Sequence, residues 1–345
     1  MRDILEELTA WSEVGRRFAV ARLLQTWGSA PRRPGATMIV DGEGRVAGSV
    51  SGGCIEGSVI ETARSVLADG VAREITFGVD DEKAWSVGLS CGGEVTVWVE
   101  PAWSETAALA WDAIRHAVTA ARPVILVTRI KPAPPAMWVL DPAGSEVPGE
   151  AGPAPAPAVI ESAREAYAAR ASRVLELDAE RFFLHVLPRP DRLLVVGAGH
   201  IAVHLVALAR EVGFETVVID PRKTFAQHVR FPVPPDRLLD DWPDQVLPSL
   251  NVDEDCYAVL LTHDPKIDDP ALYHLLRSPA AYIGALGSRR THGKRVERLR
   301  NAGFSEADVQ RIQGPVGLDI GAANPAEIAL SILAAVIARK RQKAS

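Results

Sequence analysis

Cysteine is scarce in this chain, and the few cysteines follow no familiar metal-binding spacing. There are three among 345 residues. An odd, low number in a chain of this length is typical of a reducing compartment, so we expect a cytoplasmic location. There is no C-x-x-C pair and no iron–sulfur run of cysteines, which argues against a zinc site and against an iron–sulfur enzyme.

Long apolar runs and an excess of basic residues are also missing. No apolar stretch approaches the ~18 residues of a membrane span, and residues 1–24 carry acidic side chains where a signal peptide would have an apolar core. Lys and Arg total 38 against 44 Asp and Glu, which gives a formal net charge of -6. We therefore expect no membrane partner and no nucleic-acid partner, since the latter needs a basic surface.

The second half of the chain contains a glycine-rich turn between two regular elements. An apolar run, residues 193–196, is followed by Gly197, Gly199 and Ala202 in the spacing G-x-G-x-x-A. A helical pattern with Ile201 on its apolar face follows directly. Gly197 would allow the tight turn, and Gly199 would let the backbone approach a pyrophosphate at the helix N-terminus, where free N–H groups favour an anion.

A second apolar strand, residues 216–219, ends at Asp220. The order of strand, glycine turn, helix, strand and acid predicts a Rossmann-like domain, in which Asp220 would accept a ribose hydroxyl. For Arg222 we favour a solvated surface position. His200 would contact a ligand phosphate or simply cap the helix. We also expect Ile201 to contact the ligand.

Two further strands of this domain end in polar residues. We expect strands over residues 257–262 and 281–286, and the carboxyl ends of parallel strands form the ligand-binding edge of such sheets. The residues at these ends are His263, Ser288, Arg289 and Arg290. A histidine there would orient or contact a ligand. Arginines at this position would suit binding of a phosphate or a pterin-linked anion. Alternatively, they are surface charges at the start of a helix.

The first half of the chain mixes predicted helices and strands without strict alternation. We expect helices over residues 1–25, 55–67 and 106–121, a hairpin over 37–50, and strands over 72–77, 95–100, 124–128, 174–177 and 182–187. The Pro-rich residues 188–190 mark a boundary. The prediction is an α/β protein, with a smaller α+β domain over residues 1–187 and a doubly wound parallel sheet over residues 191–345.

Two cysteines lie in separate glycine-rich turns of the first half. Cys54 follows Gly52 and Gly53 just before a predicted helix, where the thiolate form is favoured, and Cys91 precedes two glycines. Thiolates suit a thiophilic metal or sulfur transfer, whereas the alternative is a pair of small buried side chains. We expect both turns to line one pocket facing the Rossmann strands. Cys256 lies within a predicted strand and should belong to the core.

Several motifs together resemble one family. They are GSVSGGCIEG (48–57), GLSCGGE (88–94), VVGAGHIA (195–202), YIGALGSRR (282–290) and GPVGLDIGAANPAEIALSI (314–332). In combination they resemble the XdhC/CoxI family of accessory factors for xanthine dehydrogenase and related molybdenum hydroxylases. The resemblance implies a chaperone without turnover of its own that binds molybdenum cofactor (molybdopterin), with Cys54 and Cys91 as candidate contacts to molybdenum.

The resemblance also implies partners and leaves alternatives. The partners would be an apo molybdenum hydroxylase of the xanthine dehydrogenase type and a cysteine desulfurase, and a homodimer follows only from the base rate of symmetric oligomers. An NAD(P)-dependent oxidoreductase fits the glycine turn, although no catalytic acid–base pair is evident. A cysteine-dependent sulfurtransferase fits the reactive cysteines, although no His–Cys motif is readable.

Overall fold

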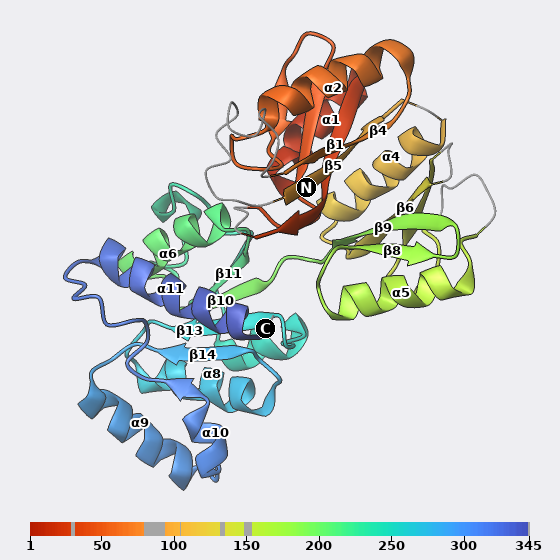
Figure 1. Ribbon diagram of the computed structural model, residues 1–345. Helices are drawn as coiled ribbons and strands as arrows, with labels where there is room; N and C mark the ends of the chain where they lie inside the picture. Colours follow the sequence, from red (N-terminus) through yellow and green to blue (C-terminus); the bar gives the residue numbers. More distant parts are fainter. Residues whose placement is uncertain (29–31, 79–93, 104, 132–134, 148–153, 344–345) are drawn as a thin grey trace. The chain divides into compact units, whose positions relative to one another are not determined.

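The computed structural model describes the chain except for residues 29–31, 79–93, 104, 132–134, 148–153 and 344–345. The chain divides into two compact units, Met1–Arg189 and Pro190–Ser345 (Figure 1). Within the described residues, no helix is both long and apolar enough to cross a membrane.

The first unit contains a five-stranded antiparallel sheet in the order β3-β2-β1-β5-β4. Its strands are β1 (Phe18–Trp27), β2 (Thr37–Asp41), β3 (Val46–Gly48), β4 (Arg73–Phe77) and β5 (Glu94–Pro101). Helix α2 (Glu56–Asp69) covers one face because Val59, Ala63 and Val66 recur at helical spacing and are buried.

A second, four-stranded antiparallel sheet in the order β7-β6-β9-β8 completes this unit. Its strands are β6 (Val124–Lys131), β7 (Ala136–Leu140), β8 (Arg173–Leu177) and β9 (Glu180–Leu187). The other α-helices among the described residues of this unit are α1 (Leu5–Glu13), α4 (Glu105–Thr119) and α5 (Pro157–Ala168). The expected N-terminal α+β architecture is confirmed, although α5 was not predicted and the unit is the longer of the two, not the smaller as expected.

The predicted helix over residues 1–25 is wrong in its second half. Helix α1 ends at Glu13, Gly15 adopts a positive φ of 63°, and Phe18–Trp27 forms β1 at the centre of the five-stranded sheet. The first seven residues of β1 are all buried, because neighbouring strands and packed layers surround them. A continuous apolar run lacks the periodic pattern of apolar and polar residues that distinguishes a strand from a helix.

The second unit is built on a six-stranded parallel sheet in the order β12-β11-β10-β13-β14-β15, as expected for a Rossmann-like domain. The strands are β10 (Arg192–Val196), β11 (Glu215–Ile219), β12 (Arg237–Leu239), β13 (Cys256–Leu260), β14 (Tyr282–Ala285) and β15 (Ile312–Gln313). The strand order runs outward in both directions from the β10–β13 pair. Ligands of such sheets bind at the carboxyl ends near this switch point.

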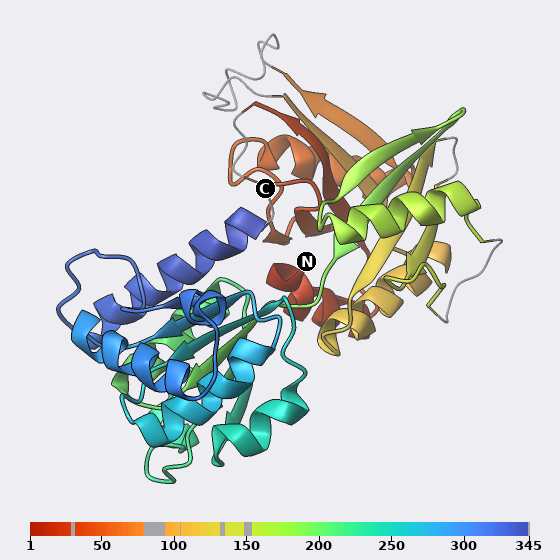
Figure 2. The same cartoon turned by 90° about the horizontal axis from the view of Figure 1, so that it is seen from below.

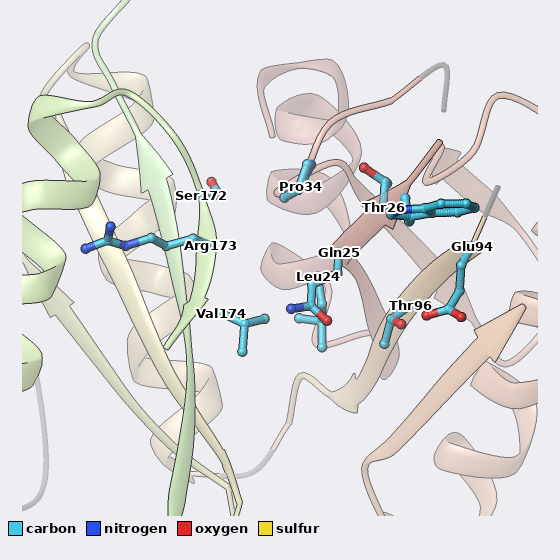
Figure 3. Close-up of a pocket in the computed structure, with 10 residues that line it drawn as sticks. Leu24, Gln25, Thr26, Pro34, Glu94, Thr96, Ser172, Arg173 and Val174 are labelled. Carbon is cyan, nitrogen blue, oxygen red and sulfur yellow. The ribbon is translucent and has the colours of Figure 1, made fainter. Parts of the chain in front are cut away.

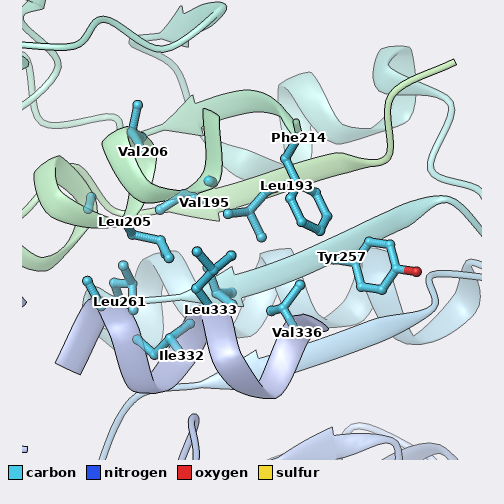
Figure 4. Close-up of a cluster of buried hydrophobic side chains, with 14 of the residues drawn as sticks. Leu193, Val195, Leu205, Val206, Phe214, Tyr257, Leu261, Ile332, Leu333 and Val336 are labelled. Carbon is cyan, nitrogen blue, oxygen red and sulfur yellow. The ribbon is translucent and has the colours of Figure 1, made fainter. Parts of the chain in front are cut away.

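Helices cover both faces of the parallel sheet (Figures 1 and 2). Helices α6 (His200–Glu211) and α11 (Pro325–Lys343) lie on one face, where Leu205, Ile332 and Leu333 pack against Leu193 and Val195 (Figure 4). On the other face, α8 (Pro265–Arg277) and α9 (Arg289–Asn301) contribute buried leucines to a second cluster. The unit also contains the short helices η2 (His228–Arg230), α7 (Pro243–Val246), η3 (Leu247–Leu250) and α10 (Glu306–Gln310).

Candidate functional site

The glycine turn connects β10 to α6 at the switch point of the parallel sheet. Gly197 has a φ of +107°, and a Cβ atom there would lie 2.7 Å from Thr262 Cγ2. Gly199 is the N-cap of α6, with no side-chain cap and nothing within 4 Å of where its Cβ would be. Gly197 therefore serves packing, whereas Gly199 faces open space at a helix N-terminus, where backbone N–H groups favour an anion.

Asp220 ties the glycine turn to the end of β11. Its carboxylate is fully buried and accepts hydrogen bonds from the Ala198 backbone N–H at 2.8 Å and from the Arg222 backbone N–H at 3.0 Å. Arg222 adds Nε and Nη2 bonds at 2.9 and 2.7 Å. These four donors match the roughly four lone-pair positions of a carboxylate. The ribose role of Asp220 stays a prediction that requires one of these bonds to be exchanged.

The Asp220 carboxyl is held in its charged form. Burial by itself raises the pKa of Asp220, but the hydrogen bonds from Arg222 and from the Ala198 N–H outweigh burial and leave the pKa below its ordinary value. The expectation that Arg222 is merely a solvated neighbour is therefore wrong. Although its side chain is partly exposed, its guanidinium is fixed by Asp220.

A second guanidinium also reaches the glycine turn. Arg230 Nη1 donates to the Ala198 carbonyl at 3.0 Å. The Phe225 ring lies against both guanidinium groups, with its centroid 4.3 Å from Arg222 and 4.8 Å from Arg230. Two cations are thus held beside the turn by contacts that restrict their rotamers. Arg230 was not singled out from the sequence, because the 33 residues that separate it from Gly197 hide the contact.

A pocket of about 280 Å³ opens at the carboxyl ends of β13 and β14. Six of its lining residues carry ionisable side chains: His263, Asp268, Arg290, Lys294, Arg295 and Arg298. The prediction placed His263 and Arg290 at the ligand edge of the sheet, and the structure brings these two residues into one pocket. Arg289, although adjacent in sequence, is not among the lining residues.

Arg295 is the most unusual member of this pocket. The residue is 2% exposed, and its Nη2 donates to the Leu286 carbonyl at 3.0 Å and lies 3.5 Å from Asp268 Oδ2. Its Nε and Nη1 are buried without an acceptor among the described residues. Leaving a buried donor unpaired costs about 1–3 kcal/mol. An arginine three residues after His292 and four before the buried Leu299, on the inner face of α9, was the sequence signal that we missed.

Asp268 is the pocket's buried acid. Its Oδ1 accepts a hydrogen bond from Thr262 Oγ1 at 2.5 Å, directly before His263. Burial raises the pKa of Asp268, and the Thr262 hydroxyl and the Arg295 charge oppose that shift without cancelling it. His263 is exposed and has a φ of +62°, a conformation that is uncommon outside glycine. The end of β13 therefore contributes His263, in an uncommon backbone conformation, to the same pocket as the buried Asp268 carboxyl.

Ser288 begins α9 at the rim of the same pocket. Its Oγ accepts from the Thr291 backbone N–H at 3.1 Å, so it is the N-cap of the helix. Its predicted ligand contact stays a prediction. Arg289, Arg290 and Lys294 form no ion pair with described residues, whereas Arg298 is held by Asp269 at 2.6 and 2.8 Å. The first turns of α9 thus carry unneutralised positive charge.

The cysteine turn of the first unit is organised by Glu56. Its carboxylate accepts from the backbone N–H groups of Ser51, Gly52 and Gly53 at 2.9, 3.1 and 2.9 Å, and from the Ser51 hydroxyl at 2.5 Å. Burial opposes ionisation, but hydrogen bonds from the Ser49 hydroxyl at 2.6 Å and from the Ser51 hydroxyl and N–H lower the pKa of Glu56 to about 2. Cys54 is half-buried beside this network. The N–H groups of the turn are therefore directed at Glu56 rather than at a ligand.

Of the other two cysteines, the structure describes Cys256 but not Cys91. Cys256 is fully buried, as expected for a core position, and burial raises its thiol pKa to about 11. Cys91 lies outside the described residues, so the expected pocket shared by Cys54 and Cys91 stays a prediction. Among the described residues, no group of three or more His, Cys, Asp or Glu side chains is arranged to hold a metal ion.

The first unit has a further pocket, of about 390 Å³, between β1 and the segment that starts β8 (Figure 3). Its lining includes Gln25, Thr26 and Glu94 on one side and Ser172 and Arg173 on the other. None of the residues predicted from the sequence to bind a ligand lines it.

Comparison with known proteins is consistent with the two-unit architecture. Residues 193–336 match the model of the XdhC Rossmann domain, and residues 11–78 match that of the XdhC and CoxI family. A crystal structure from Bacillus halodurans, described as a xanthine dehydrogenase, covers 98% of this chain and 96% of its own chain, with a TM-score of 0.80 and 26% identity.

Two curated relatives match over most of their length. A Bacillus subtilis (strain 168) protein, named as a probable xanthine dehydrogenase component, is 28% identical over 340 residues, which cover 98% of this chain and 97% of the relative. The Escherichia coli (strain K12) molybdenum cofactor insertion chaperone PaoD is 26% identical over 323 residues, which cover 93% of this chain and 83% of the relative. With its Rossmann-like sheet, glycine turn and cysteine turn, the chain belongs to the XdhC/CoxI family.

Proposed function

We propose that this protein is an accessory factor that binds molybdenum cofactor and assists its sulfuration and insertion into xanthine dehydrogenase or a related molybdenum hydroxylase. The observation that carries the proposal is the similarity to the insertion chaperone PaoD across 93% of this chain. In this role the protein has no turnover of its own. Its partners are an apo-hydroxylase and a cysteine desulfurase.

The second unit supplies a place for the cofactor's phosphate. The open space at Gly199 lies at the N-terminus of a 12-residue helix, and Arg222 and Arg230 are held beside the same turn. Helix N-termini and guanidinium groups both favour phosphate oxygens. In the proposal, Gly199, His200 and Ile201 form the phosphate end of the binding site, and Gly197 sets the turn that places them.

The first unit supplies the soft donor. Cys54 is half-buried and follows three residues whose backbone N–H groups are bonded to Glu56. A thiolate is a suitable ligand for molybdenum and a suitable acceptor of persulfide sulfur. In the proposal, Cys54 contacts the metal or carries the sulfur, and Cys91 supports it as a second ligand or resolving thiol.

The main alternative is an NAD(P)-dependent oxidoreductase. The glycine turn favours it, but a bound dinucleotide needs a free acceptor for its ribose hydroxyl. Four protein donors already engage the Asp220 carboxylate, at 2.7 to 3.0 Å. This arrangement favours the accessory role, in which a pterin cofactor without an adenosine ribose is bound.

The test is cofactor retention by the Gly199→Val variant. A valine would fill the open space at the turn, so the variant should lose most copurified molybdopterin and fail to reactivate an apo-hydroxylase. The matched control is Gly42→Val, which also enters open space but lies in a hairpin of the first unit. If a folded Gly199→Val protein retains molybdopterin and reactivates the client as wild type does, the proposed site is wrong.

A further inference from the structure

The pocket at the ends of β13 and β14 has a feature that the fold by itself does not require. Arg295 is 2% exposed and lines the pocket, and its Nε and Nη1 have no acceptor among the described residues. Leaving buried donors without an acceptor is costly. Arg22 leaves the same two atoms unpaired among the described residues, so what distinguishes Arg295 is that it also lines a pocket. These two groups indicate that an acceptor from outside the chain completes their hydrogen bonds.

The charges around Arg295 show which kind of acceptor fits. Asp268 faces Arg295 Nη2 at 3.5 Å, and Asp269 neutralises Arg298. Arg290 and Lys294 also line the pocket and form no ion pair with described residues. The lining therefore has an excess of positive charge, which favours an anion.

Helix α9 reinforces this preference. It is 13 residues long, Ser288 caps the N–H of Thr291, and Arg290 and Thr291 of its first turn line the pocket. An anion at this end is stabilised by the helix dipole as well as by the side chains. A phosphate group, with three or more acceptor oxygens, matches several donors that approach from one helix.

We propose that this pocket is a phosphate-binding subsite, in which Arg295, Arg290 and Lys294 hold a phosphate group. None of its lining residues belongs to the glycine turn, which is its neighbour along the edge of the sheet through Thr262. The inference deepens the proposed function, because molybdopterin carries a phosphate and a dinucleotide form of the cofactor carries a diphosphate. Phosphate binding itself does not depend on the client or on molybdenum.

The test is calorimetric titration of the full chain with inorganic phosphate and with pyrophosphate at low salt. The Arg290→Ala/Lys294→Ala variant changes two exposed side chains and should fold normally. It should bind both probes at least ~10-fold more weakly, since hydrogen bonds to charged groups are among the strong ones. Arg300→Ala, which removes the same charge from the far end of α9, should change the affinity less than about 2-fold because of screening.

Arg295→Lys provides a second variant that keeps the charge and removes the guanidinium geometry. It should also weaken phosphate binding, and the exposed double variant decides the question if Arg295→Lys does not fold. The inference is overturned if wild type binds neither probe at millimolar concentration. It is equally overturned if the double variant binds normally, or if Gly199→Val abolishes binding and the double variant does not.

Competition then identifies the source of the phosphate. AMP carries a phosphate monoester, whereas NAD carries an internal diphosphate. If only one of them displaces bound phosphate, the pocket binds that class of phosphate group. Displacement by neither means that only an adventitious anion binds, which overturns the inference. If phosphate binds as expected but molybdopterin does not copurify, the subsite stands and the proposed function fails.

Discussion

Gly197 and Thr262 follow different strands, yet a Cβ atom on Gly197 would come within 2.7 Å of Thr262 Cγ2 and 3.2 Å of the Thr262 backbone nitrogen. The carboxyl ends of β10 and β13 are therefore in close contact through a glycine. This contact defines the centre of the ligand edge, with the open space at Gly199 next to it. The two glycines of one motif thus have different physical roles.

The first prediction separates these two roles. Gly197→Ala should destabilise the protein by about 1–3 kcal/mol, because the residue has a positive φ and the added methyl has no space. Gly199→Ala should cost less than about 1 kcal/mol, since its Cβ meets nothing. Urea unfolding measures both. Equal effects would contradict the assignment of Gly197 to packing.

The second prediction concerns the turn that holds Cys54. Glu56→Gln should destabilise the protein by about 1–3 kcal/mol at neutral pH, because several backbone N–H groups lose a charged acceptor. The folded pKa of Glu56 is about 2, below its ordinary value of 4.5. Its stabilisation is therefore fully present above about pH 4.5 and is lost as the pH falls toward 2.

The measurement is the free energy of unfolding of wild type and Glu56→Gln between pH 3 and 7. The difference between them should shrink as the pH is lowered below about 4.5. Glu61→Gln, on the exposed side of the same helix, is the control and should change little. A difference that stays constant down to pH 3 would rule out the Glu56 carboxylate as the acceptor that stabilises the turn.

The third prediction contrasts Cys54 with Cys256. Cys54→Ser should fold normally but fail to support reactivation of an apo-hydroxylase, because serine lacks the soft sulfur donor. Cys256→Ser should instead lower stability by about 1–2 kcal/mol, since a hydroxyl enters an apolar cluster in which Asp253 Oδ1, 3.5 Å from the sulfur, compensates only part of the cost. Mass-spectrometric mapping of iodoacetamide labelling should show Cys54 modified before Cys256, whose thiol pKa of about 11 keeps it protonated. Full reactivation by Cys54→Ser would make that cysteine a packing residue.

The fourth prediction concerns a buried ion pair in the first unit. Arg22 Nη2 lies 2.6 Å from Glu100 Oε1, and both residues are almost fully buried in adjacent strands. Arg22→Met should destabilise the protein by about 3–5 kcal/mol, because it leaves the Glu100 carboxylate buried without its cation. Adding Glu100→Gln should restore part of the loss. Strict additivity in this double-mutant cycle would show that the pair is not coupled.

The architecture of the second unit could be predicted from the sequence. The spacing of Gly197, Gly199 and Asp220 between apolar runs depends on local geometry, and the parallel sheet follows from alternating strands and helices. The ends of β13 and β14 were therefore placed correctly, and with them His263 and Arg290. The first unit was harder, because the apolar run of β1 fits a helix and a buried strand equally.

By itself, the sequence determined the Rossmann-like fold, the family motifs and the residues at the carboxyl edge of the sheet, because each depends on short-range spacing. The tertiary structure alone decided what the charged residues do. Asp220 accepts hydrogen bonds from Arg222 and the Ala198 N–H, and Arg295 is buried with two donors that have no acceptor among the described residues. The burial and pairing of a charged side chain depend on residues brought together from separate strands and helices, so they cannot be predicted from local sequence spacing.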